Sequence, residues 1–270
     1  MAKRIEVAPA PKGRVIDKQA VALSFSRAAA SYDAVANIQR WVIGRLLESM
    51  GPMQQVQKIL DVGCGTGQLM MALQKQYQSP TVVGLDIAEG MTRAATQRTG
   101  LPAVCGDAEA MPLPDQAFDL LVSSFALQWC PDLERVFSEA RRVLQPGGRF
   151  YFALPVSGTL DELRDCWAQV DSDNSHVNEF YHGDDLVTAA RKAGFSHVSL
   201  RVQAQREYYP DLRAITSALK AMGAHNITQG RARQLTGKHK LKALVDAYEG
   251  YRTGKGLPLT WQVGFGVLEK

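Results

Sequence analysis

The chain has 270 residues, of which 46% are hydrophobic and 21% charged, and its formal net charge is +4. These values are ordinary for a globular protein, and so small a positive charge is too weak to argue for a nucleic-acid partner. No apolar run approaches 18 residues and no secretory signal is recognisable, so we expect no membrane span and a cytoplasmic location. The chain has four cysteines, Cys64, Cys105, Cys130 and Cys166. They lie too far apart in sequence to suggest a zinc-binding or redox pair, so we expect reduced thiols and no bound metal.

The N-terminal part of the chain precedes any regular pattern. Residues 1–16 contain prolines and a glycine and predict a flexible leader, whereas residues 17–52 predict a helical lid. From residue 53 to residue 156, short apolar strands alternate with helices, and a turn is expected at "QPGG" (145–148) before the strand 149–155. This alternation predicts an α/β fold with a doubly wound, mostly parallel sheet that forms a core domain over 53–156.

In the C-terminal part, residues 157–270, strands and helices no longer alternate regularly. We expect two long strands at 197–209 and 257–270, separated by helices and by a basic, loop-like stretch at 225–240. These strands are expected to complete the sheet, one of them antiparallel at its edge. The helices between them form a C-terminal helical insertion on the substrate side.

A glycine-rich turn follows the first strand of the core, in "ILDVGCGTGQL" (59–69). Gly63, Gly65 and Gly67 alternate there, and glycine permits positive φ and a close approach by a ligand. A strand, such a turn and a helix in succession predict a nucleotide-type site. The dinucleotide fingerprint would need glycine where Gln68 stands, and no phosphate-loop lysine follows. A plain tight turn is the alternative.

Two acidic residues follow the next strands. Asp86 ends the second strand, where it is placed to accept hydrogen bonds from both hydroxyls of a ribose. Asp107 follows the third strand at the same edge of the sheet, although a helix cap would also explain it. Two carboxylates beside a crowded glycine turn would repel a pyrophosphate, so they predict a cofactor without phosphates.

Four motifs resemble those of the class I S-adenosylmethionine-dependent methyltransferases over residues 56–154: "DVGCGTG", "GLDIAEGM", "GDAEAMPLPDQAFDLLVSSFALQW" and "EARRVLQPGGRF". The resemblance implies a Rossmann-like sheet of seven strands and S-adenosylmethionine as the cofactor. It implies that the glycine turn lies against the methionine portion, with Asp61 near the amino group. Asp86 would then hold the ribose, while Asp107 and Ala108 would meet the adenine. The further cofactor contacts that it implies are Cys64, Thr66, Ile87, Met91, Glu109 and Ser124.

The flanking segments narrow the resemblance. "KQAVALSFSRAAASYDAVANIQR", "FALQWCPDL" and "LKAMGAHNITQGRARQLTGKHKLKAL" resemble the malonyl-acyl-carrier-protein O-methyltransferases of biotin synthesis. The resemblance implies methyl transfer to the free carboxylate of a malonyl thioester, which gives the methyl ester that starts pimeloyl synthesis. That carboxylate is ionised at neutral pH, so no general base is required. The chain must instead align oxygen, methyl carbon and sulfur and exclude water.

Candidates for the substrate side come from several segments. Tyr32 is a candidate for orienting the substrate carboxylate, with a core tyrosine as the alternative. Gln128 and Trp129 follow the fourth strand, at the edge where open α/β sheets bind ligands. Lys220 and His225 match the second flank and are candidates for the acyl entrance, although a helix end would also explain His225.

A basic stretch offers a surface for a partner. It is either a solvated face or a docking site for an acidic acyl-carrier protein, with Arg14 and Lys18 as weaker candidates. Another small-molecule or quinone methyltransferase, and a non-catalytic cofactor-binding scaffold, remain as alternative functions. No nucleic acid or membrane partner is expected. The stretch consists of Arg231, Arg233, Lys238, Lys240 and Lys242.

Overall fold

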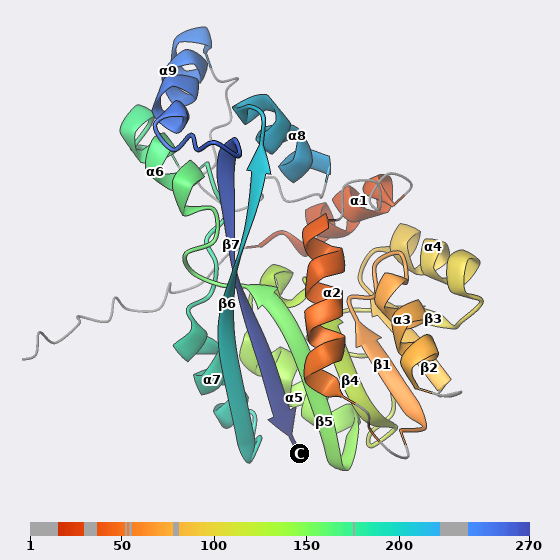
Figure 1. Cartoon of the computed structure of the whole chain (residues 1–270). Helices are drawn as coiled ribbons and strands as arrows, with labels where there is room; N and C mark the ends of the chain where they lie inside the picture. The colour runs from red at the N-terminus through yellow and green to blue at the C-terminus, as the bar shows by residue number, and fades with distance from the viewer. Residues whose placement is uncertain are drawn as a thin grey trace, which may run out of the picture.

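The computed structural model describes residues 16–29, 37–51, 53, 56–77, 81–174, 176–221 and 237–270. Its centre is a seven-stranded sheet with the strand order β3-β2-β1-β4-β5-β7-β6 (Figure 1). All neighbouring strands are parallel except that β7 runs antiparallel to both β5 and β6. The predicted α/β fold with a mostly parallel sheet is confirmed. The strands are β1 Lys58–Val62, β2 Thr81–Asp86, β3 Ala103–Cys105, β4 Phe118–Ser124, β5 Leu144–Pro155, β6 His197–Tyr209 and β7 Leu257–Glu269.

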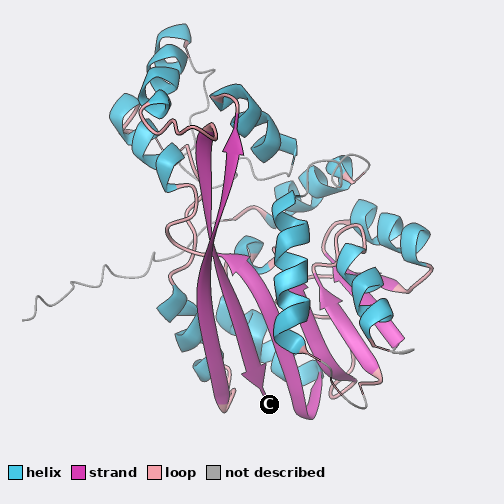
Figure 2. Ribbon diagram, in the orientation of Figure 1, coloured by secondary structure: helices cyan, strands magenta, loops and turns pink. Residues whose placement is uncertain are grey.

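Helices cover both faces of this sheet (Figure 2). In Figure 1, α2 lies in front of the sheet, whereas α5 and α7 lie behind it. A short 3₁₀ helix, Leu127–Trp129, follows β4. The α-helices are α1 Lys18–Ala28, α2 Asn37–Met50, α3 Gln68–Gln76, α4 Glu89–Thr99, α5 Leu133–Val143, α6 Asp161–Val170, α7 Gly183–Lys192, α8 Leu212–Ala221 and α9 Lys238–Glu249.

The strands of the sheet are buried on both faces, which produces two core layers. In β4, Leu120 and Val122 pack into the layer that contains α2 and α3, and Leu121 packs into the layer that contains α5 and α7. All three side chains are at most 1% exposed. Full burial of one such side chain contributes about 1.5–3 kcal/mol to folding, so this double burial holds the central strands rigidly under the site.

Two details of the sheet differ from the sequence-based expectation. The antiparallel strand is β7, which lies between β5 and β6 rather than at the edge. The strand β5 begins at Leu144, so the expected "QPGG" turn lies inside it, with Gly147 at a φ of 77°. The pairing of β4 with β5 shifts register there, between Phe118 and Leu120. Between these pairs β4 advances two residues and β5 advances five, from Leu144 to Arg149, so β5 carries three extra residues without ending as a strand, which local turn chemistry does not reveal.

The site lies at one end of the sheet. In Figure 1 the arrows of β1 and β5 point toward the end of the molecule where α1, α8 and α9 lie. No helix in the described ranges is long and apolar enough to cross a membrane. Tyr32, His225, Arg231 and Arg233 lie outside the described residues, as do residues 1–15 of the expected leader.

Candidate active site

The glycine-rich turn joins the carboxyl end of β1 to the start of α3. Gly63, Gly65 and Gly67 have φ angles of 77°, 51° and 84°, in the left-handed region that glycine adopts without strain. The N–H of Gly63 donates to the carbonyl of Leu85 in β2 at 2.7 Å. A Cβ at Gly63 would lie 2.1 Å from the Cβ of Ala126, so the turn has no room for a larger residue there.

A recess lies beside this turn, and we call it the glycine-loop recess. In it, Asp61 is only 1% exposed, and neither carboxylate oxygen has a hydrogen-bond partner in the described structure. Burial, together with the nearby charge of Asp86, raises the pKa of Asp61 to about 8. The buried Ser124 hydroxyl likewise has no partner there. The recess is lined by Gln39, Ile43, Asp61, Gly63, Cys64, Gly65, Thr66, Gln68, Leu69 and Ser124.

The unpaired polar groups of this recess indicate which ligand group would fit there. A buried polar group without a partner costs about 1–3 kcal/mol, and a charged one costs more. An ammonium group beside Asp61 would remove that cost, because a neighbouring positive charge favours the ionised carboxylate. The recess therefore fits the amino group of an amino-acid portion of a cofactor.

Asp86 lies at the end of β2 and holds the glycine turn from the other side. Its Oδ2 accepts a hydrogen bond from the Gly65 N–H at 2.9 Å, and its Oδ1 accepts one from the Ala88 N–H at 2.8 Å. Burial raises the pKa of Asp86, although these two hydrogen bonds oppose the shift. Each carboxylate oxygen has a second lone pair, so Asp86 can accept ligand hydroxyls while it holds the turn.

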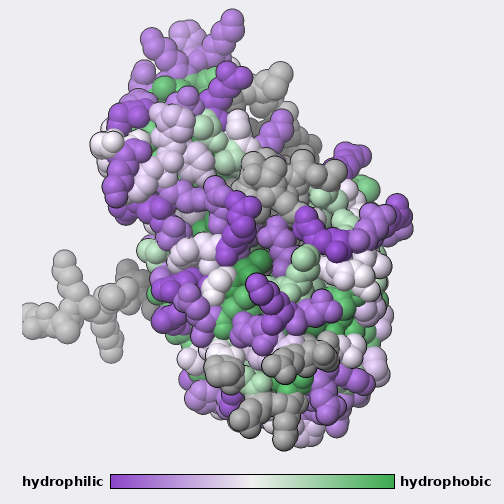
Figure 3. Space-filling view, turned by 45° about the vertical axis from the view of Figure 1, so that its right-hand side comes forward, coloured by the Kyte–Doolittle hydropathy of each residue, from purple (hydrophilic) through white to green (hydrophobic). Residues whose placement is uncertain are grey.

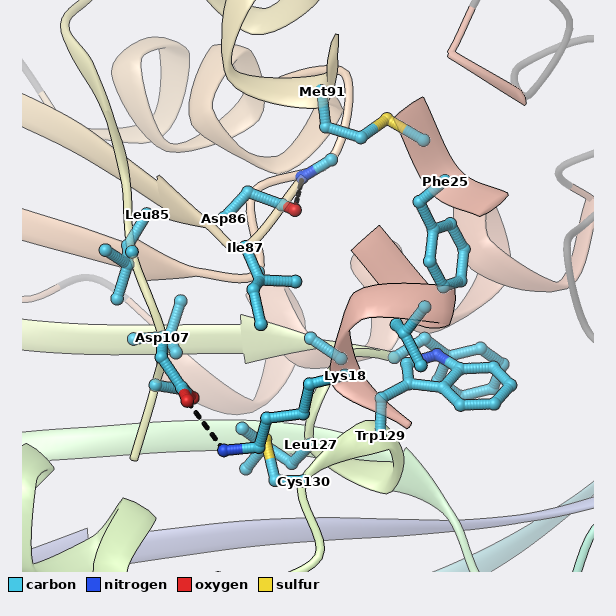
Figure 4. A pocket seen from close by; sticks show the side chains of 18 of the residues that line it. Lys18, Phe25, Leu85, Asp86, Ile87, Met91, Asp107, Leu127, Trp129 and Cys130 are labelled. Carbon is cyan, nitrogen blue, oxygen red and sulfur yellow. Dashed lines mark hydrogen bonds and ion pairs between the residues drawn. The ribbon is translucent and has the colours of Figure 1, made fainter. Parts of the chain in front are cut away.

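A large cavity opens between the turn and α1, and we call it the cofactor cavity (Figure 4). Its empty space, including the open mouth, is about 760 Å³. Val21 and Phe25 of α1 form part of its wall, and neither was predicted as a site residue. The sequence-predicted residues that line it are Gly63, Gly65, Asp86, Ile87, Met91, Asp107, Ala108, Ser124 and Trp129.

Lys18 also reaches into the cofactor cavity, as Figure 4 shows. Its Nζ lies 2.6 Å from an oxygen of Asp107 and 2.6 Å from an oxygen of Glu109. This ammonium is thus paired at the site, and Lys18 is not available as the weaker docking candidate. Glu109, which is buried, also accepts a hydrogen bond from the Asp132 N–H at 3.0 Å. Glu109 therefore fastens α1 and the start of α5, and it does not line the cavity.

A second cavity, of about 450 Å³, adjoins the first, and we call it the aromatic cavity. The two cavities share Phe25, Phe125 and Trp129. The rings of Phe25 and Trp129 meet edge to face with their centroids 5.6 Å apart. Gln128 lines this second cavity, and its Nε2 donates to the Phe125 carbonyl at 2.7 Å. The other lining residues are Gln39, Pro155, Leu160, Asn178, Phe180 and Trp261.

Some sequence-predicted residues do not meet at these cavities. Lys220 is exposed on α8 and lines none of the three cavities described above. Gly67 lies before α3, where an added Cβ would come within 2.7 Å of Thr99, so this glycine allows close helix packing. Cys64 lines the recess, but burial raises the pKa of its thiol, which stays protonated and is a poor nucleophile.

At the cofactor site the carboxylates of Asp61 and Asp86 fit a cationic cofactor without phosphates, whereas the third carboxylate, Asp107, is already paired with Lys18. A family model described as a methyltransferase domain matches residues 60–152, which contain all three. The fold is also that of the YcgJ protein of Bacillus, a solved structure with a TM-score of 0.60 and 19% identity that covers 86% of this chain and 98% of the other. Fold and site together define a class I methyltransferase, whose cofactor is S-adenosylmethionine.

Curated relatives specify the family. The chain is 40% identical to the malonyl-[acyl-carrier protein] O-methyltransferase of Serratia marcescens, over 94% of this chain and 96% of that protein. It is 41% identical to the biotin biosynthesis bifunctional protein BioHC of Cellvibrio japonicus, and it spans 51% of that longer protein's length. The chain belongs to the malonyl-[acyl-carrier protein] O-methyltransferase family.

Proposed function

We propose that this chain transfers the methyl group of S-adenosylmethionine to the free carboxylate of a malonyl thioester carried by acyl-carrier protein. The product is the methyl ester that starts pimeloyl synthesis for biotin. The observation that carries the proposal is an identity of 40% over an alignment that covers 94% of the chain, well beyond the cofactor motifs. The alignment therefore includes the flanks, where relatives with other substrates would be expected to differ.

The residues of the cofactor site have separate tasks in this proposal. Asp61 accepts from the ammonium group, Asp86 accepts from the ribose hydroxyls, and Asp107 with Ala108 meets the adenine. Bound S-adenosylmethionine supplies a methyl group made electrophilic by the sulfonium charge. A Cβ at Gly65 would meet nothing within 4 Å, so the missing side chain there leaves room for the cofactor to lie against the turn.

The chain contributes to the reaction by aligning the carboxylate oxygen with the methyl carbon and sulfur and by excluding water. The malonyl carboxylate is ionised at neutral pH and needs no general base. In agreement, the described residues that line the three cavities include no histidine. Val21 and Phe25 line the cofactor cavity from α1, and Trp129 is part of the wall that both cavities share. Excluding water from this wall strengthens the attraction between carboxylate and sulfonium.

The experiment that tests the function is a methyl-transfer assay with labelled cofactor. Malonyl-acyl-carrier protein, malonyl-coenzyme A and a quinol are offered as separate acceptors. We expect label on the malonyl thioesters, with the carrier protein preferred. Transfer only to the quinol would support the quinone methyltransferase alternative, and cofactor binding without any transfer would support a non-catalytic scaffold.

The carrier protein is proposed to dock on α9. Lys238 and Lys242 are exposed there, and Lys240 is half exposed although it pairs with Asp171 at 2.9 Å. Figure 3 shows hydrophilic side chains gathered at the top of the molecule, where α9 lies in Figure 1. Leu241, 51% exposed, lies between these lysines and adds an apolar contact. A basic face with an apolar centre fits an acidic carrier protein.

Charge reversal tests this docking face. In the double variant Lys238→Glu and Lys242→Glu, we expect a higher KM for the carrier-protein substrate and a smaller effect at high salt, because steering is screened within about 8 Å at physiological ionic strength. The matched control reverses the exposed Lys58 and Lys75, of which Lys58 begins β1 at the opposite end of the sheet. Malonyl pantetheine, which lacks the carrier protein, should be methylated equally by all three proteins. A loss with both substrates would show that α9 has a structural role instead.

A further inference from the structure

The aromatic cavity differs in chemistry from the cofactor cavity beside it. None of the described residues that line it carries a charge. Its walls are mostly aromatic, and its polar groups are the carboxamides of Gln39, Gln128 and Asn178. The aromatic side chains are those of Phe25, Phe125, Trp129, Phe180 and Trp261.

Asn178 is buried in this cavity with unmet hydrogen-bonding capacity. The residue is 6% exposed, and its Oδ1 has no partner in the described structure. Buried polar groups without a partner are rare in folded proteins and call for an explanation. Among the described residues no hydrogen bond to Oδ1 fixes the orientation of the amide, so a half-turn about its last torsion would present the NH₂ group in place of the oxygen.

The backbone around Asn178 is nevertheless firmly anchored. Its carbonyl oxygen accepts from Arg164 at 3.5 Å. Three residues further on, Tyr181 forms a β-bridge with Val156, and its hydroxyl donates to the Cys130 carbonyl at 2.7 Å. The loop therefore places the Asn178 side chain in the cavity, and the free amide does not result from a loose segment.

Gln128 lines the same cavity and also has an unpaired oxygen. Its Nε2 is held by the Phe125 carbonyl, while its buried Oε1 has no partner among the described residues. Both side chains are more than nine-tenths buried. Because the NH₂ group of Gln128 is already held, its free oxygen can only accept from a donor on a ligand, whereas Asn178 can offer its NH₂ group to an acceptor such as a carboxylate.

We propose that the aromatic cavity receives the acyl end of the substrate, and that the Asn178 amide orients the substrate carboxylate through a neutral N–H donor. This inference rests on the proposed function. In the reaction, a carboxylate oxygen bonds to the methyl carbon while the bond from that carbon to sulfur breaks, and its electron pair stays on sulfur. The negative charge of the carboxylate and the positive charge of the sulfonium both disappear.

This loss of charge explains why the carboxamide of Asn178 suits the task better than a cation would. A lysine or arginine beside the carboxylate would stabilise its negative charge most strongly before the reaction. A neutral N–H in a water-free aromatic wall orients the carboxylate without stabilising the ground state so strongly. The low polarity of the cavity also disfavours the separated carboxylate and sulfonium ions relative to the transition state. Asn178 is accordingly a specificity-determining residue for a carboxylate acceptor.

Two substitutions at one position test the inference. Asn178→Asp has nearly the same size but replaces the donor by a negative charge, and Asn178→Leu removes all polarity. We expect Asn178→Asp to raise the KM for malonyl pantetheine by about 10- to 100-fold, the range for losing a hydrogen bond to a charged group. The affinity for S-adenosylhomocysteine should stay within about twofold, because Asn178 does not line the cofactor cavity. Gln169→Glu, on the exposed surface of α6, is the matched amide-to-acid control.

Asn178→Leu separates a functional role from a structural one. If the amide serves the substrate, this variant should lose kcat/KM yet melt at the same temperature as the wild type or higher, because an unpaired buried group has been removed. A wild-type KM in both variants, or a lower melting temperature in Asn178→Leu with parallel loss of cofactor affinity, would overturn the inference. Binding of malonyl pantetheine to the complex with S-adenosylhomocysteine is measured separately. If the wild type binds malonyl pantetheine but transfers no methyl group to it, the proposed function is wrong. The assignment of the aromatic cavity to the acyl end is then decided by binding alone: it holds if Asn178→Asp abolishes that binding and fails if it does not.

Discussion

The unpaired carboxylate of Asp61 leads to a prediction about protons. Its pKa is raised to about 8 by burial and by the neighbouring Asp86. At pH 7 about nine in ten molecules of the free protein therefore carry a proton on Asp61. When the ammonium group of the cofactor enters the recess, the ionised form becomes favourable and that proton leaves.

The magnitude follows from proton linkage. Provided that the pKa of Asp61 in the complex falls well below 6, binding at pH 7 releases about 0.9 proton, and the affinity rises about ninefold between pH 6 and pH 7. The pH range stays below 7 because the ammonium group of the ligand itself begins to titrate at higher pH. S-adenosylhomocysteine is the probe, since it carries the same amino group and is not consumed.

Titration calorimetry in two buffers with different ionisation enthalpies measures the number of protons released. Asp61→Asn is the matched control, because its amide cannot ionise and any titration of the ligand remains. The difference between the two proteins should be about 0.9 proton at pH 7. A difference near zero, with an affinity in the wild type that does not change between pH 6 and pH 7, would refute the placement of the ammonium group beside Asp61.

The same raised pKa affects the stability of the free protein. The folded state holds the Asp61 proton more tightly than the unfolded state, whose aspartate titrates near 4. Stability from this group is therefore complete below pH 4 and is lost progressively as the pH rises toward 8. Relative to Asp61→Asn, the wild type should lose melting temperature over that interval, and ligand should restore it.

The remaining predictions concern single side chains. Asp86→Ala should weaken cofactor binding by about 1.5–3 kcal/mol, as for a hydrogen bond to a charged group, and calorimetry on the folded variant measures this. Lys18→Met should lower the free energy of unfolding in urea by about 1–3 kcal/mol, because buried Glu109 loses its cation; an unchanged midpoint would show that the pair does not fasten α1. His182→Gln should keep most of the single-turnover rate, since His182 precedes α7 and lines none of the three cavities; a loss of several orders of magnitude would indicate a general base.

The cofactor side of the site was predictable because it is local. Gly63 and Gly65 follow an apolar strand directly, and Asp86 and Asp107 follow the next two strands. Parallel strands bring their carboxyl ends to one edge, so the sequence pattern alone placed these residues together. The structure brings them to the same cavity.

The residues that distant segments bring to the two cavities were not predictable in the same way. In the cofactor cavity, Lys18 lies 89 residues from Asp107 along the chain, and nothing in its neighbourhood distinguishes it from a solvated lysine. Asn178 belongs to a polar stretch that looks like an ordinary loop, and only the packing of Phe180 and Trp261 around the cavity makes it a buried amide. Similarly, the insertion of β7 between β5 and β6 depends on pairing across more than a hundred residues, which local patterns do not encode.

The distribution of charge differs between the cofactor site and the aromatic cavity, and this difference directs each ligand to its own region. Acidic groups surround the cofactor site, where Asp61 and Asp86 face a cationic ligand, and a carboxylate substrate admitted among them would be repelled. At 4 Å and an effective dielectric constant of 20, one such contact costs about 4 kcal/mol. The described residues that line the aromatic cavity include no carboxylate, and the rings of Phe25 and Trp129 lie in the wall that the two cavities share. A malonyl group can therefore approach the sulfonium only from the neutral side, once the positive charges of the bound cofactor have offset the acidic residues behind it. In the empty site Asp61 is largely protonated, so the negative charge that holds the cofactor develops fully only when the cofactor binds.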